Sequence, residues 1–191
     1  MTIEAPAPRR LLTLSESGRY LKKKPNQKKD FLTGIRNMQA LIDHLSVIKA
    51  NAQFWEQMLA ITLDPMPQPG QFSADPGHMR ASVALSGVWN GSIEVRLAEG
   101  LAYLATSVMM MQPVDSVSQA DALDATREIA NIIAGSLKSS LPRPCAMTVP
   151  ESDLETQHFH SPSPAADALM VVFRHAAGNL MVRVWEQDCQ Q

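Results

Sequence analysis

The sequence predicts an α+β fold, in which a mostly antiparallel sheet is covered by two or three helices. Strand-like segments occur as two hairpins, and the first turns at Asn90-Gly91, the strongest short signal for a two-residue turn. Segments with a helical period occupy other stretches, in the order helix, hairpin, helix, helix, strands. The strand–helix–strand alternation of a parallel sheet does not occur, and no glycine-rich phosphate-binding motif is present, which argues against a nucleotide-binding Rossmann core.

An apolar stripe predicts the first helix, between Phe31 and Asp64. The residues of the stripe recur at intervals of three and four, as one face of an amphipathic helix requires, and are Leu41, Leu45, Ile48, Ala52, Trp55 and Leu59. Three alternating prolines begin at Pro65, so the helix must end near Asp64. Residues 64–80 are therefore predicted to form an irregular loop.

The middle of the chain predicts a hairpin followed by a helix. Apolar and polar residues alternate in Ala81–Val88 and in Ile93–Leu97, on either side of Asn90-Gly91. Leu97–Met111 then has apolar residues at intervals of three and four, which predicts a helix. The run Met109–Met111 within it is interpreted as filling of the core.

The longest helix is predicted to begin after Ser118 and to reach Leu141. Ser118 is a preferred N-cap residue, and Pro142 and Pro144 prevent the helix from continuing. Three strand-like runs close the chain, and a Gly-containing connection joins the last two of them: Cys145–Val149, Ala168–Arg174 and Leu180–Trp185.

The composition is typical of a globular protein and argues against a membrane-spanning or disulfide-stabilised one. The 191 residues are 45% hydrophobic and 19% charged, which suits one domain with a real core. No apolar run approaches the roughly 18 to 20 residues that a membrane-spanning helix needs. The two cysteines, Cys145 and Cys189, form no disulfide framework, so a cytoplasmic protein is expected.

Charge divides the chain into two parts. Residues 1–30 hold eight Lys or Arg and three acidic residues, a net charge of +5, whereas residues 31–191 hold nine basic and sixteen acidic residues, a net charge of −7. We therefore expect a basic, Pro-containing and poorly ordered leader over residues 1–30 and a single domain over residues 31–191. No aromatic residues interleave with the lysines of the leader, so neither nucleic acid nor a membrane is expected as a partner.

One face of the longest helix collects polar residues. At about 100° per residue, with Asp124 at zero, Glu128, Asn131, Gly135 and Lys138 all lie within about 40° of it. The opposite face is apolar and wide enough to pack on a sheet, so the polar stripe points outward. A Gly inside a helix costs about 1 kcal/mol relative to Ala, which is understandable where another molecule approaches the backbone closely. The same pattern also fits an ordinary solvated face on which Gly135 admits a neighbouring segment of its own chain.

The spacing Asp124-x3-Glu128-x2-Asn131 resembles the [DS]-x3-E-x2-N signature of the CheX/CheC/FliY family of chemotaxis phosphatases. Residues 121–138 are similar to the central helix of that family, including the Gly four positions after the Asn, and residues 86–93 are similar to its glycine-containing hairpin. The resemblance covers about residues 50–185. The single copy of the motif is similar to the one-site CheX type rather than to the two-site CheC type.

The resemblance implies a CheC-like fold and a phosphatase that hydrolyses the aspartyl phosphate of a response-regulator receiver domain of the CheY type. It implies that the catalytic residues are Asn131, which orients the attacking water, and Glu128, which docks the partner through a cation of the receiver. Asp124, Gly135 and Lys138 are expected to contact the partner. The resemblance also implies Mg²⁺ on the receiver, no cofactor or metal of the chain's own, and a homodimer.

Two other functions stay open. The family pattern continues with a Pro at the position of Leu154, for which Pro150 is a candidate counterpart, so a non-catalytic CheX-like module that binds a regulator is one alternative. A flagellar-switch-like structural component with the related fold is the other. His158 and His160 have no third ligand near them in the sequence, so no metal site is expected there.

Overall fold

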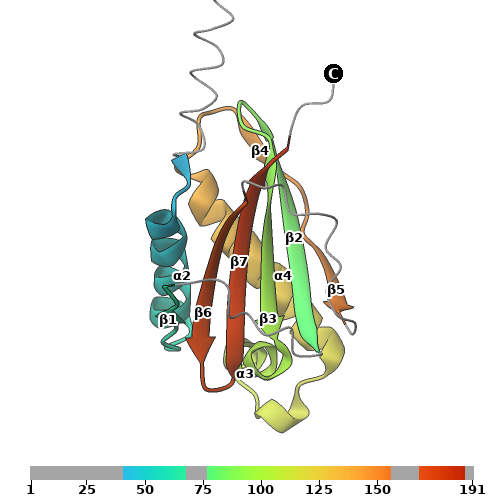
Figure 1. Ribbon diagram of the computed structural model, residues 1–191. Coiled ribbons are helices and arrows are strands. Elements are labelled where there is room, and N and C mark those ends of the chain that lie inside the picture. Colours follow the sequence, from blue (N-terminus) through green and yellow to red (C-terminus); the bar gives the residue numbers. More distant parts are fainter. Residues whose placement is uncertain (1–40, 68–76, 156–167, 188–191) are drawn as a thin grey trace, which may run out of the picture.

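A computed structural model describes residues 41–67, 77–155 and 168–187, which form one antiparallel sheet with its helices on one face (Figure 1). The basic leader, the predicted start of the first helix at Phe31, and His158 and His160 lie outside the described residues. The helices are α2 (His44–Met58), α3 (Glu99–Met110), the short 3₁₀ helix η3 (Val114–Ser116) and α4 (Gln119–Lys138). The strands are β1 (Asp64–Pro65), β2 (His78–Gly87), β3 (Gly91–Ala98), β4 (Cys145–Met147), β5 (Glu151–Glu155), β6 (Leu169–His175) and β7 (Gly178–Glu186).

The sheet has the strand order β1-β6-β7-β3-β2-β4, and β5 also pairs with β2. Every pairing is antiparallel, which confirms the predicted α+β class with an antiparallel sheet under helices. The long strands β2, β3 and β7 form the centre, where β3 pairs with β2 over its whole length and with β7 over Gly91–Leu97. No helix in the described part of the chain is long and apolar enough to cross a membrane.

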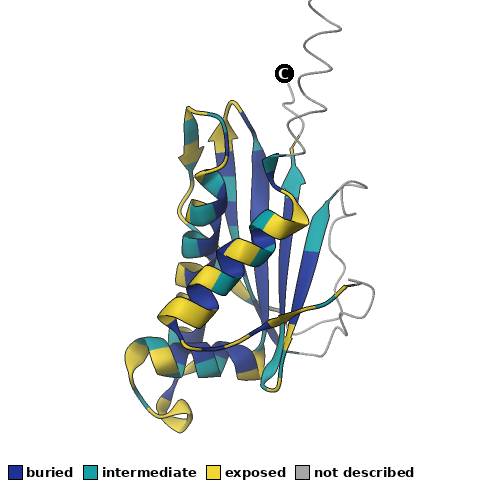
Figure 2. Ribbon diagram, turned by 90° about the vertical axis from the view of Figure 1, so that its left-hand side faces the viewer, coloured by how far each residue is buried: buried dark blue, intermediate teal, exposed yellow. Residues whose placement is uncertain are grey.

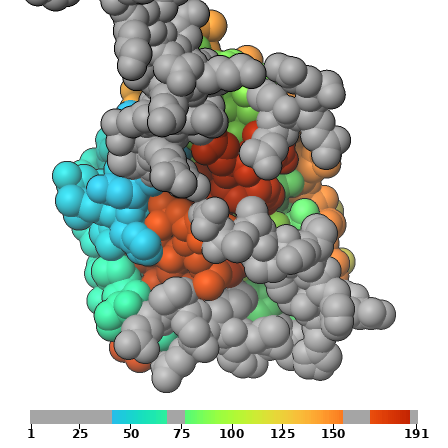
Figure 3. Space-filling view, turned by 45° about the horizontal axis from the view of Figure 1, so that its top comes forward, coloured from blue at the N-terminus to red at the C-terminus, as the bar shows by residue number. Residues whose placement is uncertain are grey.

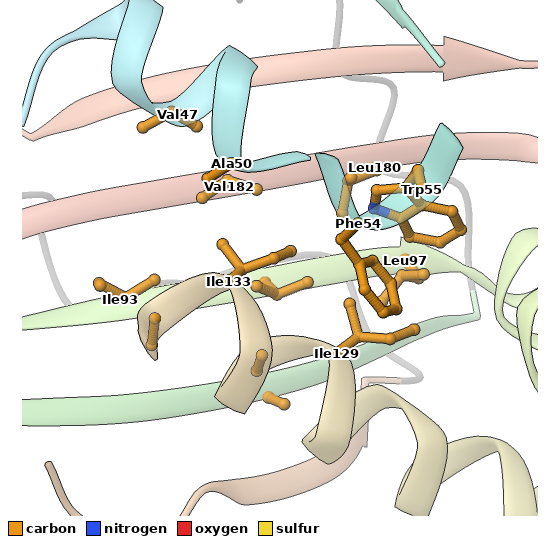
Figure 4. Packing of buried hydrophobic residues seen from close by; sticks show 14 of the residues in the cluster. Val47, Ala50, Phe54, Trp55, Ile93, Leu97, Ile129, Ile133, Leu180 and Val182 are labelled. Carbon is orange, nitrogen blue, oxygen red and sulfur yellow. The ribbon is translucent and has the colours of Figure 1, made fainter. Parts of the chain in front are cut away.

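The core lies between the sheet and the helices α2 and α4 (Figures 2 and 4). Ile129 and Ile133 of α4 face the sheet near Leu97 and Ile93 of β3 (Figure 4). Phe54 of α2 lies on the same side of the sheet, so the two helices share one core (Figure 4). Along one side of the molecule α2 lies beside β6 (Figure 3).

The face of the sheet opposite α2 and α4 holds a charged cluster that ties β2 to β3. Glu94 accepts hydrogen bonds from the Nε atoms of Arg80 and Arg96, each at 2.9 Å, and its side chain is only 4% exposed. Asp153 of β5 also accepts from Arg80, at 3.2 Å. Paired charges at this depth cross-link the two strands that support α4.

The first helix buries only part of the predicted stripe: Trp55 and Leu59 are buried as predicted. Leu45 was placed on the apolar stripe and is 54% exposed, whereas Val47, Ala50 and Phe54 are buried. The side chain of Asp43 caps the helix by accepting from the Ser46 N–H at 2.7 Å, so the described helix begins at His44. The prediction was wrong at Leu45 because two apolar stripes of similar length overlap in this sequence.

Two short strands were not predicted. Asp64–Pro65 and Glu151–Glu155 lack the apolar alternation of a strand, and each is recruited by a longer neighbour, β6 and β2 respectively. Residues 64–80 are therefore not wholly a loop, because β1 lies within them and β2 begins at His78.

The methionine run at the end of α3 was also interpreted wrongly. Met109 packs partly against the core, but Met110 is 48% exposed and Met111 is 92% exposed. Met111 has a left-handed backbone conformation, with φ 52°, and ends the helix there. Two of the three methionines therefore lie at the surface.

Helix α4 begins with a capping box. The Ser118 hydroxyl oxygen accepts from the Asp121 N–H at 3.1 Å, and the Asp121 carboxylate accepts from the Ser118 hydroxyl and N–H at 2.6 and 3.2 Å. These two donors, the hydroxyl first, lower the pKa of Asp121 from its ordinary value of 3.8. The box fixes the residue at which the helix, and therefore its exposed stripe, begins.

We expect Ser118→Ala to lower the free energy of unfolding by about 1 kcal/mol, the usual loss for an N-cap residue. Urea unfolding followed by circular dichroism near neutral pH measures this. Because the folded pKa of Asp121 is lowered, the contribution of the box is present above pH 3.8 and is lost as the pH falls through the lowered pKa. The difference between wild type and variant should therefore shrink in acid; a difference that grows there would contradict the capping geometry.

Candidate functional site

Helix α4 is held against the sheet by small and β-branched side chains. Ala130, Ile133 and Ala134 have no exposed surface, and Leu137 continues the same buried face toward the end of the helix. Alanines allow the helix axis to approach the strands closely, and isoleucines have few side-chain conformations to lose on packing. The outer face of α4 is therefore carried on a rigid support.

The outer face presents the residues that the sequence analysis singled out. Asp124, Glu128 and Gly135 are exposed, and Asn131 and Lys138 are half-buried. All five lie on one helix without a break, so their order along the surface is their order in the sequence. The structure thus brings these five residues together on one side of α4, facing away from the core.

Asn131 lies in the middle of this stripe. The neighbouring Ala130, together with Ile133 two positions on and Ala134 one turn on, is buried, so the backbone at Asn131 is fixed. Within the described ranges its amide makes no hydrogen bond to the rest of the chain. An amide offers both an acceptor and two donors, so this side chain can hold a water molecule or a polar group of another molecule.

The two carboxylates of the stripe have different surroundings. Asp124 forms an ion pair with Arg127, its neighbour three positions along α4. Glu128 has no ion pair with any residue of the described chain, and its side chain is exposed. Glu128 is therefore the carboxylate that is free to meet a cation of another molecule, whereas Asp124 is already engaged.

Gly135 faces an open space among the described residues. A Cβ atom built at this position would have nothing within 4 Å among the described residues. The alternative in which Gly135 admits a neighbouring segment is not supported by this part of the structure. The residue leaves an open stretch of backbone one turn beyond Asn131.

A hollow beside the end of α4 was missed by the sequence analysis. It has a volume of about 810 Å³ and is lined by Gly135, Lys138, Ser139, Arg143, Pro144, Cys145 and Met147. The one feature of the sequence related to this hollow is the hairpin glycine Gly87. Its φ is 146°, and a Cβ atom at this position would lie 2.1 Å from the Pro144 carbonyl oxygen, so only Gly allows the two segments to come this close. That contact can be read only once the two segments are placed side by side.

Leu154, which stands where the family pattern has a Pro, is part of a strand. Leu154 lies in β5, packs partly against the core and pairs with Met79 of β2. Pro150 stands immediately before the strand, where a residue without an N–H is tolerated. In the part of the chain that is described, no group of three or more His, Cys, Asp or Glu side chains is arranged to hold a metal ion.

Comparison with known proteins identifies relatives of this fold. The family model described as "Chemotaxis phosphatase CheX" matches residues 79–174, a segment that contains α4 and the hairpin β2–β3. A search of curated proteins finds no match. The matched segment includes Asp124, Glu128 and Asn131.

Solved structures share the architecture. The chain is similar to the chemotaxis protein CheX of Vibrio vulnificus, with a TM-score of 0.62 and 18% identity over 75% of this chain and 95% of that one. It is similar to a CheC-like superfamily protein of Shewanella sp. PV-4, with a TM-score of 0.62 and 16% identity over 74% and 95%. It is also similar to a chain of the CheX–CheY–BeF₃–Mg²⁺ complex of Borrelia burgdorferi, with a TM-score of 0.61 and 19% identity over 78% and 99%. These likenesses confirm the predicted CheC-like fold.

We expect Gly135→Ala to raise the free energy of unfolding by about 0.5 to 1 kcal/mol, because Ala favours the helix and its methyl group meets nothing in the described chain. Urea unfolding of the two proteins, compared at the same pH, measures this. A lower stability of the variant would show that Gly135 is needed for packing within its own chain.

Proposed function

Because this chain belongs to the CheX family of chemotaxis phosphatases, we propose that it hydrolyses the aspartyl phosphate of a response-regulator receiver domain of the CheY type. The observation that carries the proposal is the position of Asn131, on a rigidly packed helix, with no hydrogen bond inside the described chain and with the bare backbone of Gly135 beside it. Such an amide is ready to enter a partner's active site.

Hydrolysis of an acyl phosphate needs a water molecule in line with the bond that breaks. The receiver supplies Mg²⁺ and a lysine around the phosphoryl group, so the charge that develops there is already balanced. The Asn131 carbonyl oxygen accepts a hydrogen bond from the water and its NH₂ group donates one, which orients the water toward phosphorus. A neutral amide does this without repelling the anionic phosphoryl group.

Glu128 has a docking role in this proposal. It lies one turn before Asn131 on the same exposed face, and a carboxylate placed there is suited to a cation at the rim of the receiver's active site rather than to the phosphate. Asp124 lies a further turn away, at the margin of the contact. Its carboxylate contributes less to docking because it already pairs with Arg127. Gly135 and Lys138 extend the contact on the other side of Asn131.

The proposed enzyme acts as a homodimer in the cytoplasm. It needs no metal of its own, because the Mg²⁺ belongs to the receiver. A non-catalytic module of the same fold would bind the phosphorylated receiver without shortening its lifetime, and a structural component would form large assemblies. Turnover of the acyl phosphate therefore separates the proposal from both.

We expect Asn131→Ala to lower the catalysed rate of receiver dephosphorylation on the order of 10² to 10⁴-fold, which corresponds to about 3 to 5 kcal/mol for the alignment of one water. The rate is measured from the decay of the phosphorylated receiver with increasing amounts of purified protein. The circular dichroism spectrum and the affinity for the receiver should stay close to those of wild type, since Asn131 makes no hydrogen bond in the described chain. Unchanged decay with this variant would falsify the assignment of Asn131.

We expect Glu128→Ala to act mainly on docking, raising the KM for the phosphorylated receiver about tenfold, because an exposed carboxylate loses its cationic partner. The same titration of the decay rate measures it. Asp124→Ala is the matched comparison, one turn away on the same helix, and should have a smaller effect because its carboxylate pairs with Arg127. An equal effect of the two substitutions would contradict the docking role of Glu128.

A further inference from the structure

The hollow at the C-terminal end of α4 lies in direct continuation of the exposed stripe. Gly135 belongs to both, and Lys138 lines the hollow one turn further on. Asn131 and Lys138 are seven residues apart, which is about 10 Å along the axis and a difference of about 20° around it. A globular partner that brings a phosphoryl group to Asn131 is wider than this distance and must lie over the hollow as well.

Charge gives the surface a direction. Asp124 and Glu128 lie on the N-terminal side of Asn131, whereas Lys138 and Arg143 lie on its C-terminal side. Neither cation forms an ion pair with a residue of the described chain, and the residues that line the hollow include no acidic one. Lys138 complements the partial negative charge of the helix end, but Arg143 lies beyond the helix and has no such explanation.

The wall of the hollow is held in place by the central sheet. The Val88 N–H donates to the Pro144 carbonyl oxygen at 3.0 Å, and Cys145 and Met147 of β4 pair with Gly87 and Leu85 of β2. The Pro144 carbonyl can lie this close only because Gly87 has no side chain. A preformed wall lowers the ordering cost of binding, so the hollow can contribute to affinity.

The lining combines apolar atoms with two cations. Pro144, Met147 and the Cys145 side chain offer apolar surface, while Lys138 and Arg143 offer positive charge. A segment that suits both carries a carboxylate beside an aliphatic or aromatic side chain.

We propose that the hollow receives an acidic surface segment of the receiver domain, and that it sets both the orientation of docking and the choice among receivers. This inference rests on the proposed function for the identity of the partner. In it Glu128 meets a cation of the receiver, Lys138 and Arg143 meet its carboxylates, and Asn131 reaches the phosphoryl group between them. The occupant is thus a protein segment rather than a free anion.

The test is a charge reversal with a matched control. Lys138→Glu/Arg143→Glu is compared with Lys49→Glu/Arg174→Glu, which makes the same change in net charge at two exposed cations that do not line the hollow. Affinity is measured by titration of a receiver held in its active form by beryllofluoride and Mg²⁺, and the decay of the phosphorylated receiver is followed in parallel. Circular dichroism and urea unfolding establish that each variant is folded. If the charge-reversal variant does not fold, the neutral variant Lys138→Met/Arg143→Gln takes its place in the same measurements.

We expect the hollow variant to raise the Kd and the KM about tenfold or more, with a much smaller change in kcat, while the control pair stays within about twofold of wild type. Raising the salt concentration from about 50 to about 200 mM should weaken wild-type binding and weaken the hollow variant less. Equal losses in both pairs, or no loss in the hollow variant, would overturn the inference. If wild type binds the receiver but does not shorten its lifetime, the proposed function fails, and the comparison of Kd values still decides the inference.

Cys145 gives an independent readout of where the partner lies. In a Cys189→Ser background, Cys145 is the remaining thiol, and it lines the hollow half-buried. Saturating activated receiver should slow its alkylation several-fold, whereas inorganic phosphate alone should not. An alkylation rate of Cys145 that is unchanged by saturating receiver, or that is slowed by phosphate alone, would contradict a docked protein segment.

Discussion

The packing of α4 on the central strands is the interaction on which the rest of the structure depends. A continuous face of alanines and isoleucines, with Ile129 and Ile133 fully buried, holds the helix close to β2 and β3. The Glu94 cluster on the other face of the sheet ties those two strands together. A helix fixed in this way has no freedom to roll, so the direction of its outer residues is decided by the core. The buried face of α4 thus determines which residues form its exposed stripe and in which direction they point.

This arrangement suits an enzyme that brings little chemistry of its own. The proposed reaction divides its requirements between two proteins: the receiver carries the phosphoryl group, the metal and a cation, and this chain adds one oriented amide. This chain must hold the Asn131 amide in a fixed position relative to the receiver. The rigid helix fixes the amide, and the charges around the amide orient the receiver. The carboxylate of Glu128 before Asn131, which is unpaired within the described chain, and the cations Lys138 and Arg143 after it favour one orientation of an asymmetric partner over the reverse.

Much of the fold could be predicted from the sequence, and the misses have physical causes. The two hairpins and α4 were found because strong local signals, Asn90-Gly91 and the Ser118 cap, agree with the long-range packing. The strands β1 and β5 were missed because Asp64–Pro65 and Glu151–Glu155 are strands only by virtue of their neighbours. The stripe residues could be placed because one helix carries them all. The hollow could not, since Arg143 and Cys145 come beside Gly135 only through the contact of Gly87 with Pro144.

In the proposed reaction, the neutral amide of Asn131 orients the water without accepting its proton. Asn131→Asp tests this directly, because it keeps the size of the side chain and replaces the NH₂ group by a charged oxygen. The measurement is the single-turnover decay of the phosphorylated receiver at saturating amounts of the variant, followed across pH. We expect decay close to the receiver's own rate at every pH above the pKa of the new carboxyl group. Decay as fast as with wild type, rising as that carboxyl group ionises, would show a general base at this position and contradict the role of a neutral amide.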